Sequence, residues 1–377
     1  MRFKRKAIFF LPYSLDKDFI KKYDIKNAKK VFNIKFFNLE KINQKYEKDR
    51  NFDLDRNLYN LKKILLNFKP EIGIMLGHDS CHKQTALFCK KYSNINMIYK
   101  NTDLIPEDII IRPKKVYLNF LFSKYFLSNL LYMIEKIFSL LKYKKINFNF
   151  DYSVTSGSAG KKIEVIKNSK KKIRICSDDY KKSFLFHLKK NNYAVFLDEN
   201  LFYHRDYVRQ KIKKKFVTKN YFNEINEFFS FFEKKFNMKI LIALHPKCKN
   251  KKVIKKLFNN RLCFLQKSHE LVSKCKYVFA HPSTTSINIP MIYKKPIFFL
   301  MTEELMENFL WKMRLERRKH FLNQPIINVS DKNNFDNFRP LNKIDYKGYR
   351  KYLNYFVKSC KRKTCVKSIW EDLNISF

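Results

Sequence analysis

The sequence predicts an α/β protein made of two Rossmann-like domains, and three observations lead to this prediction. Short apolar runs alternate with polar segments of helix length, which is the pattern of a parallel sheet with helical connections. The chain has 377 residues, 45% of them hydrophobic, which is enough for two such units. Several apolar runs also stop at polar residues, as strands do where the carboxyl edge of an α/β sheet binds a ligand.

The composition is strongly basic, with 80 Lys and Arg against 34 Asp and Glu and a formal net charge of +46. Such a charge suits nucleic acid, an anionic lipid surface, nucleotides or phosphates as partners. The basic residues are spread along the chain, without zinc-finger or RNP-like motifs, and this disfavours nucleic acid. Lys, Asn, Phe, Tyr and Ile are abundant throughout while Gly is rare, so we ascribe part of the excess charge to a coding bias.

The first half of the chain begins with a charged segment and a five-residue apolar run that ends at Pro12. This run is too short for a signal peptide and suits a first buried strand. Further strands are expected at 31–37, at 72–76, at 96–99 and at 109–111, with a helix through 61–68. The strand that ends at Gly77 is followed by His78 and Asp79, which are candidates for acceptor contacts or a pair at the edge of the core.

Two segments near mid-chain each have two interpretations. Residues 116–143 are rich in Phe, Tyr and Leu with basic flanks, but their uncharged stretch is far shorter than the roughly 20 residues that cross a bilayer. A helix here could lie on an anionic membrane surface, although packing on the sheet or between the domains is favoured.

Residues 151–161 form the second of these segments. They are interpreted as a flexible boundary loop or a phosphate contact, and the boundary is favoured. Ser156 and Gly157 within it are acceptor-side candidates.

The second half repeats the α/β pattern. A helix is expected at 221–236, and buried strands are expected at 193–197, 239–244, 262–265, 276–280 and 296–300. After Pro340 the chain turns polar, and 346–370 reads as one or two long basic helices. The eight cysteines have no CxxC spacing, so we expect free thiols and a cytoplasmic protein.

Three strand ends in the second half carry polar residues in a fixed order. Asp198-Glu199-Asn200 comes first, a His-Pro pair begins at His245, and another begins at His281 with a run of hydroxyl residues behind it. A carboxylate can accept a proton, a histidine can stabilise a leaving phosphate, and hydroxyls with free amides at a helix start can hold phosphate. Together they indicate group transfer from a nucleotide-activated donor. The remaining residues of the two His-Pro motifs and the hydroxyl run, which we expect to bind the donor nucleotide or its phosphate, are Pro246, Lys247, Pro282, Ser283, Thr284, Thr285 and Ser286.

Each motif alone also has a structural interpretation: an exposed acidic loop, a turn histidine and a helix N-cap. His281 could bind the donor nucleotide or cap the following helix, and binding is favoured. The sequence offers no Asp-x-Asp pair near a strand end, so neither a metal nor a cofactor is expected.

In the order of its motifs the chain resembles bacterial sialyltransferases and polysialyltransferases of the GT-B fold. The resemblance covers roughly residues 190–300 and implies two Rossmann-like domains that face a cleft. It implies that Asp198 is the acceptor base, with Glu199 completing the acidic pair, and that His245 assists departure of CMP while Ser283 to Ser286 hold the phosphate. Asn200 stands where the family has Gly, and Asn tolerates a positive φ better than other non-glycine residues.

The resemblance also implies an organisation and a set of partners. Residues 1–160 would form the acceptor domain, 161–340 the nucleotide-donor domain, and 341–377 C-terminal helices that could return to the first domain. The expected partners are a nucleotide-sugar donor, with CMP favoured, and a glycan or lipid-linked acceptor of a bacterial capsule or lipooligosaccharide. A place on the inner face of the cytoplasmic membrane, held by its anionic surface, fits this chemistry.

Two alternatives stay open. Residues 281–300 also resemble the CDP-glycerol glycerophosphotransferases that build cell-surface polymers, although the acidic pair favours the sugar transferase. A basic protein that binds nucleic acid or a membrane surface without catalysis would explain the charge, but it would leave the polar strand ends without a role.

Overall fold

The computed structural model places the chain in two compact units, and each is described by itself. Unit 1 comprises Met1–Leu104, Ser139–Lys181 and Asn354–Phe377, and unit 2 comprises Ile105–Phe138 and Lys182–Leu353. The residues that the structure describes are 4–12, 15, 19–20, 23–42, 45, 54–77, 82–102, 134, 148–203, 218–246, 248, 250–282, 285–307, 309–319, 321–336, 338–339, 344–359 and 370.

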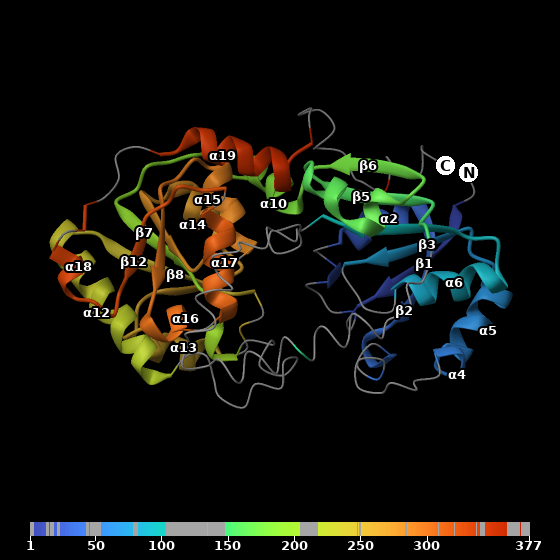
Figure 1. The fold of residues 1–377 in the computed structure, drawn as a ribbon, viewed down its shortest axis with the longest axis horizontal. Coiled ribbons are helices and arrows are strands. Elements are labelled where there is room, and N and C mark those ends of the chain that lie inside the picture. The colour runs from blue at the N-terminus through green and yellow to red at the C-terminus, as the bar shows by residue number, and fades with distance from the viewer. Residues whose placement is uncertain are drawn as a thin grey trace. The chain divides into compact units, whose positions relative to one another are not determined.

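Unit 1 is built on a six-stranded parallel sheet with the order β2-β1-β3-β4-β5-β6 (Figure 1). The strands are β1 (Arg5–Leu11), β2 (Phe32–Asn38), β3 (Ile72–Leu76), β4 (Asn96–Asn101), β5 (Tyr152–Ser156) and β6 (Lys171–Ile175). The helices are α2 (Ile25–Val31), α4 (Leu54–Asn57), α5 (Tyr59–Phe68), α6 (His82–Tyr92), η2 (Ala159–Lys162), α9 (Glu164–Lys167) and α10 (Asp178–Lys182).

The first strand of unit 1 is apolar and buried from Ala7 to Leu11, because both faces of the sheet are covered there. Ile8 and Phe10 pack into one core, whereas Ala7 and Phe9 pack into the other. Successive side chains of a strand point to opposite faces, so a strand buried on both sides needs an unbroken apolar run.

Unit 2 is built on a second six-stranded parallel sheet with the order β12-β11-β10-β7-β8-β9. The strands are β7 (Tyr193–Leu197), β8 (Lys239–Leu244), β9 (Cys263–Leu265), β10 (Tyr277–Ala280), β11 (Ile297–Met301) and β12 (Ile326–Asn328). The helices are η3 (Ser183–Leu185), η4 (Leu201–Tyr203), α12 (Lys219–Phe236), α13 (Lys251–Leu257), α14 (Ser268–Lys274), η5 (Thr285–Ile287), α15 (Asn288–Ile292), α16 (Glu303–Glu307), α17 (Phe309–Lys319), α18 (Asn333–Asp336) and α19 (Tyr346–Tyr352). The π-helical turn η6 (Leu353–Val357) follows α19, and all of it but Leu353 belongs to unit 1.

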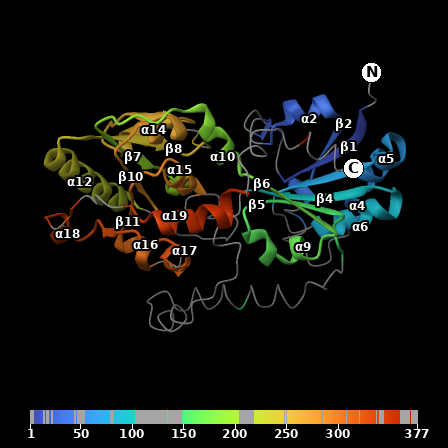
Figure 2. The same cartoon turned by 90° about the horizontal axis from the view of Figure 1, so that it is seen from above.

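Helices cover both faces of the second sheet (Figures 1 and 2). Ala194 and Phe196 of β7 share a core with the aromatic face of α12. Tyr193, on the opposite face of β7, donates a hydrogen bond of 2.9 Å to the Leu271 carbonyl of α14. The predicted fold class is therefore confirmed: the protein is α/β, with two parallel sheets in Rossmann-like units.

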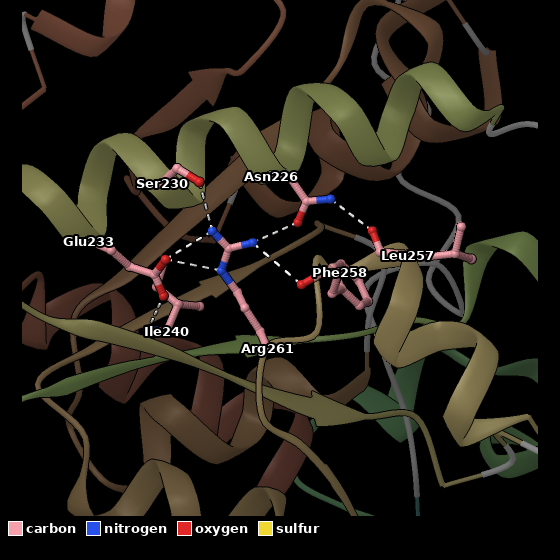
Figure 3. A network of polar contacts seen from close by, with 7 residues as sticks. All are labelled: Asn226, Ser230, Glu233, Ile240, Leu257, Phe258 and Arg261. Atoms are coloured by element: carbon pink, nitrogen blue, oxygen red, sulfur yellow. Dashed lines mark hydrogen bonds and ion pairs between the residues drawn. The ribbon is translucent and has the colours of Figure 1, made fainter.

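The long helix α12 is tied to the strand edge by one arginine. Figure 3 shows Asn226, Ser230 and Glu233 on one side of α12, all directed at the guanidinium of Arg261. That guanidinium donates to Asn226 Oδ1 at 2.8 Å, to Ser230 Oγ at 3.0 Å and to Glu233 Oε2 at 2.9 Å. Glu233 also accepts the backbone N–H of Ile240 at 2.9 Å, so the network joins α12 to the start of β8 as well.

The segment 151–161, which the sequence indicated as a flexible loop, contains a central strand, and this expectation was wrong. β5 pairs with β4 on one side and β6 on the other. Its hydroxyl residues are compatible with burial because they find partners: Ser153 Oγ lies 2.6 Å from Ser169 Oγ. A run of Ser, Thr and Gly predicts a loop from the sequence alone, because the buried partners of the hydroxyl groups cannot be identified there.

Most other expected elements agree with the structure, including the strands at 193–197 and 239–244 and the helix at 221–236. The expected long C-terminal helix is shorter, since α19 ends at Tyr352 and passes into a π-helical turn. The expected strand at 109–111 lies outside the described residues, as does 116–143 apart from Ile134. None of the described helices has the length and apolarity needed to span a bilayer.

The expectation of free thiols holds for part of the chain. The thiols of Cys89, Cys248, Cys263 and Cys275 are free and buried. Cys176 departs from the expectation because its sulfur is disulfide-bonded.

Candidate active site at the carboxyl edge of the second sheet

Three adjacent strand ends carry the predicted site residues of unit 2. β7 lies between β10 and β8, with Leu197 opposite Ala280 on one side and Ala243 on the other. Asp198, His281 and His245 each begin the segment that leaves one of these strands. Parallel strands end at one edge of the sheet, so Asp198 lies between the two His-Pro turns.

Asp198 is a buried carboxyl group held by backbone amides. Its Oδ1 accepts the N–H of Asn200 at 3.0 Å, and its Oδ2 accepts the N–H of His245 at a long 3.5 Å. Burial raises the pKa of Asp198 to about 6, and the two backbone hydrogen bonds oppose that rise. The carboxyl group therefore exchanges its proton close to neutral pH, as a general base must.

The turn after Asp198 depends on an unusual backbone conformation. Asn200 has φ of +55°, in the left-handed region that the sequence indicated Asn could adopt in place of Gly. This conformation brings the Asn200 N–H back to the Asp198 carboxylate and its carbonyl to the Tyr203 N–H at 3.0 Å. Glu199, the second acidic residue, is buried, with 4% of its surface exposed.

His245 lies in a turn at the end of β8. Its backbone N–H faces Asp198, and its carbonyl accepts the N–H of Cys248 at 2.9 Å. The residue is half-buried and Pro246 is exposed. Lys247 lies outside the described residues.

His281 is fully buried, and both of its ring nitrogens contact protein atoms. Nδ1 lies 2.7 Å from the Leu300 carbonyl, and Nε2 lies 2.6 Å from the Tyr221 hydroxyl. A carbonyl only accepts, so Nδ1 carries the proton and Nε2 accepts from Tyr221. Burial lowers the pKa of His281 to about 4, so the ring is neutral at neutral pH and fixes the start of the following loop.

A buried arginine holds that same loop and was not predicted from the sequence. Arg318 of α17 donates from Nε to the Pro282 carbonyl at 2.6 Å and from Nη1 to the Tyr352 hydroxyl at 2.8 Å. The sequence did contain a signal, because Trp311, Leu315 and Arg318 are spaced i, i+4 and i+7 and lie on one buried face.

The hydroxyl run is described only in part. Ser283 and Thr284 lie outside the described residues. Thr285 and Ser286 belong to η5, the 3-10 turn that leads into α15. The end of the run therefore enters a helical segment, as a phosphate cradle and a helix cap both require.

The acceptor-side candidates of unit 1 have a different setting. The Ser156 hydroxyl is buried between the carbonyls of Thr102, at 2.7 Å, and Phe356. Gly157 has φ of +59° and lies so close to the Tyr355 backbone that a side chain there would collide with it. Both residues contact the C-terminal segment, while His78 and Asp79 lie outside the described residues.

The side chains described do not assemble a metal site. Within the described ranges, no three His, Cys, Asp or Glu residues are grouped so that they could hold a metal ion.

Comparison with known proteins finds a likeness in structure and none in sequence. No known protein family matches the chain, and no curated protein does. Among solved structures, MurG from Acinetobacter baumannii has a TM-score of 0.46 at 6% identity, covering 99% of this chain and 98% of that one. Os79 from O. sativa in complex with UDP has a TM-score of 0.49 at 8% identity, covering 98% and 99%. CalG4, the calicheamicin glycosyltransferase, has a TM-score of 0.45 at 8% identity, covering 94% and 95%.

Scores below 0.5 at such identities say nothing about the chemistry of this chain. The case for a function therefore depends on its own residues.

Proposed function

We propose that this protein is a glycosyltransferase that uses a nucleotide-activated sugar, with Asp198 as the base. The observation that carries the proposal is the buried Asp198 carboxylate at the end of a central strand, next to the His245 turn, with its pKa raised to about 6. A structural acidic residue at a surface turn would be solvated and would keep an ordinary pKa. A raised pKa at a strand end is typical of a catalytic carboxylate.

In the proposed reaction the acceptor hydroxyl attacks the anomeric carbon of the donor sugar. Its proton passes to the Asp198 carboxylate as the new glycosidic bond forms. The bond between the anomeric carbon and the phosphate oxygen breaks, and the electron pair leaves with the nucleotide. His245 and the hydroxyl run that ends in η5 would stabilise the charge on the leaving phosphate.

The donor we propose is a CMP-activated sugar of the sialic-acid type. Its support is the order of the acidic pair, the His-Pro turn and the hydroxyl run, together with the left-handed Asn200 at the family's glycine position. The proposed acceptor is a glycan or lipid-linked precursor of a bacterial surface polymer. Transfer of glycerophosphate from CDP-glycerol is the alternative. It is disfavoured because the resemblance to those enzymes gives the acidic pair Asp198-Glu199 no role.

The first test is a nucleotide-binding panel on the full chain. Thermal shift with CMP, CDP, UDP, TDP and GDP should show selective stabilisation by CMP. A stronger effect of CDP would favour glycerophosphate transfer, and UDP or TDP alone would exclude the CMP donor. If no nucleotide binds, and DNA binds in a salt-sensitive manner, the non-catalytic alternative replaces this proposal.

The second test addresses the base directly. Asp198→Asn should retain nucleotide binding but hydrolyse CMP-sialic acid about 10²–10⁴ times more slowly, because general bases contribute about that much. Hydrolysis uses water as the acceptor, so the natural acceptor need not be known. Asp331→Asn, in a polar turn beyond β12, serves as the matched control and should leave the rate unchanged. Equal rates for Asp198→Asn and the unmodified protein would exclude Asp198 as the base.

A further inference from the structure

The most exposed apolar side chains among the described residues lie close together at the start of unit 2. Leu185 is 74% exposed and Leu188 is 64% exposed, higher than any other large hydrophobic residue described. Phe184, at 39%, adds a third apolar side chain. Single exposed leucines are ordinary, but a cluster within five residues indicates a surface that is covered in use.

The segment that carries this cluster is held in place by backbone and side-chain contacts to the rest of unit 2. Phe186 faces inward and stacks on His269 of α14, with ring centroids 6.0 Å apart and an interplanar angle of 15°. The N–H of Lys189 donates to the Ser273 carbonyl at 3.3 Å, and Lys295 Nζ donates to the Lys189 carbonyl at 3.3 Å. The leucines therefore stay exposed although the segment that carries them is anchored.

Basic residues flank the cluster on both sides. Lys181 and Lys182 precede it, Lys189 and Lys190 follow it, and no acidic residue occurs from 180 to 197. The acidic pair Asp178-Asp179 lies one turn earlier, in α10. Lys189 and Lys190 are exposed, so their ammonium groups are available to an anionic partner.

We propose that residues 181–190, here called the Leu185 segment, dock unit 2 on an anionic lipid bilayer. The leucines would enter the interfacial region while the lysines face headgroup phosphates, as in other interfacial anchors. A stable protein interface generally needs a far larger patch than three apolar residues on one short segment. Phosphate groups at the level of the lysines and apolar chains beneath them match this arrangement better. This proposal does not depend on the proposed transferase activity.

Vesicle sedimentation of the full chain tests the proposal. The protein should bind vesicles of phosphatidylcholine mixed with phosphatidylglycerol and should bind pure phosphatidylcholine weakly. Because the whole chain is basic, anionic vesicles alone would not locate the contact. The double variant Leu185→Ser/Leu188→Ser keeps every charge, and its partition coefficient should fall by about tenfold or more.

Two controls separate the Leu185 segment from the rest of the surface. Leu262→Ser removes another exposed leucine of unit 2, 54% exposed, and should leave binding unchanged. Lys251→Gln/Lys252→Gln removes two exposed charges from α13 and should weaken binding less than Lys189→Gln/Lys190→Gln does. In addition, Leu188→Trp should add an emission component to that of Trp311 and Trp370, and this added component should shift to the blue on anionic vesicles.

Three results would overturn the proposal. The first is equal partitioning of the double leucine variant and the unmodified protein. The second is that the emission added by Leu188→Trp does not shift on vesicles that bind the protein. The third is self-association in solution that the leucine variant abolishes, which would assign the Leu185 segment to a second copy of the chain.

Discussion

Burial shifts the pKa values of Asp198 and His281, two titratable side chains at this strand edge, in opposite directions. It favours the neutral form of each, so it raises the pKa of Asp198 to about 6 and lowers that of His281 to about 4. At neutral pH Asp198 is ionised and close to its titration range, whereas His281 is neutral and far from it. Asp198 is thus able to exchange a proton, and His281 is suited to positioning the loop.

The pH dependence of the proposed reaction follows from the raised pKa of Asp198. A base works only when it is deprotonated, so kcat/KM for hydrolysis of CMP-sialic acid should rise with pH and reach half its plateau near pH 6. Below that pH the rate should fall about tenfold for each unit. The residual rate of Asp198→Asn should lack this rising limb. A limb near pH 4 would mean that the carboxylate is solvated and has an ordinary pKa, and a rising limb that persists in Asp198→Asn would mean that another group is the base.

At the scale of elements, α12 is the scaffold of the site. Its apolar face carries Tyr221, which holds His281, and its polar side carries the three side chains that bind Arg261. The Arg261 guanidinium also lies 5.3 Å from the ring centroid of Phe229. Arg261 thus fixes the helix against the sheet edge through both polar and aromatic contacts.

Removal of Arg261 should destabilise unit 2. Arg261→Ala leaves the half-buried Glu233 and the buried Asn226 without their shared partner, and we expect a loss of about 2 kcal/mol in the free energy of unfolding. The chain has two tryptophans, so Trp311 fluorescence in a Trp370→Phe background can report urea unfolding of unit 2 alone. Arg350→Ala, at an exposed arginine of α19, is the matched control and should change stability little. A similar loss in both variants would contradict a special role for Arg261.

At the scale of the whole molecule, the end of the chain belongs to the unit in which the chain begins. Ser158 and Ser177 donate backbone hydrogen bonds to the carbonyls of Asn354 and Val357. The buried Trp370 ring lies 5.1 Å from Phe9, and its Nε1 donates to the Tyr23 carbonyl at 3.1 Å. Residues from both ends of the chain therefore complete the core of unit 1.

The two tryptophans give a matched test of this arrangement. Trp370→Ala should create a cavity in unit 1 that costs about 3–5 kcal/mol, and Trp311→Ala should do the same in unit 2. Hydrogen exchange should then increase in β1 and β3 for the first variant and in β7 and β8 for the second. An increase in β7 and β8 for Trp370→Ala would show that the last residues do not belong to unit 1 in solution.

The sequence by itself determined the fold class and most of the strands. A strand covered on both faces is apolar at its buried positions, so the short apolar runs within 193–197 and 239–244 predicted strands without any knowledge of their neighbours. The sequence also indicated which polar residues follow those strands and that Asn200 could adopt a positive φ. Both properties depend on only a few neighbouring residues.

Only the tertiary structure decided which strand ends are adjacent. The order β10-β7-β8 places Asp198 between residues 47 positions later and 83 positions later in the chain, and no local pattern encodes such pairing. The same holds for β5, where the buried hydroxyl of Ser153 needs the hydroxyl of Ser169 as a hydrogen-bond partner. It also holds for Arg318, whose buried guanidinium donates hydrogen bonds to the Pro282 carbonyl and the Tyr352 hydroxyl. Polar residues are assigned to the surface or the interior by partners distant in sequence, and folding alone brings those partners together.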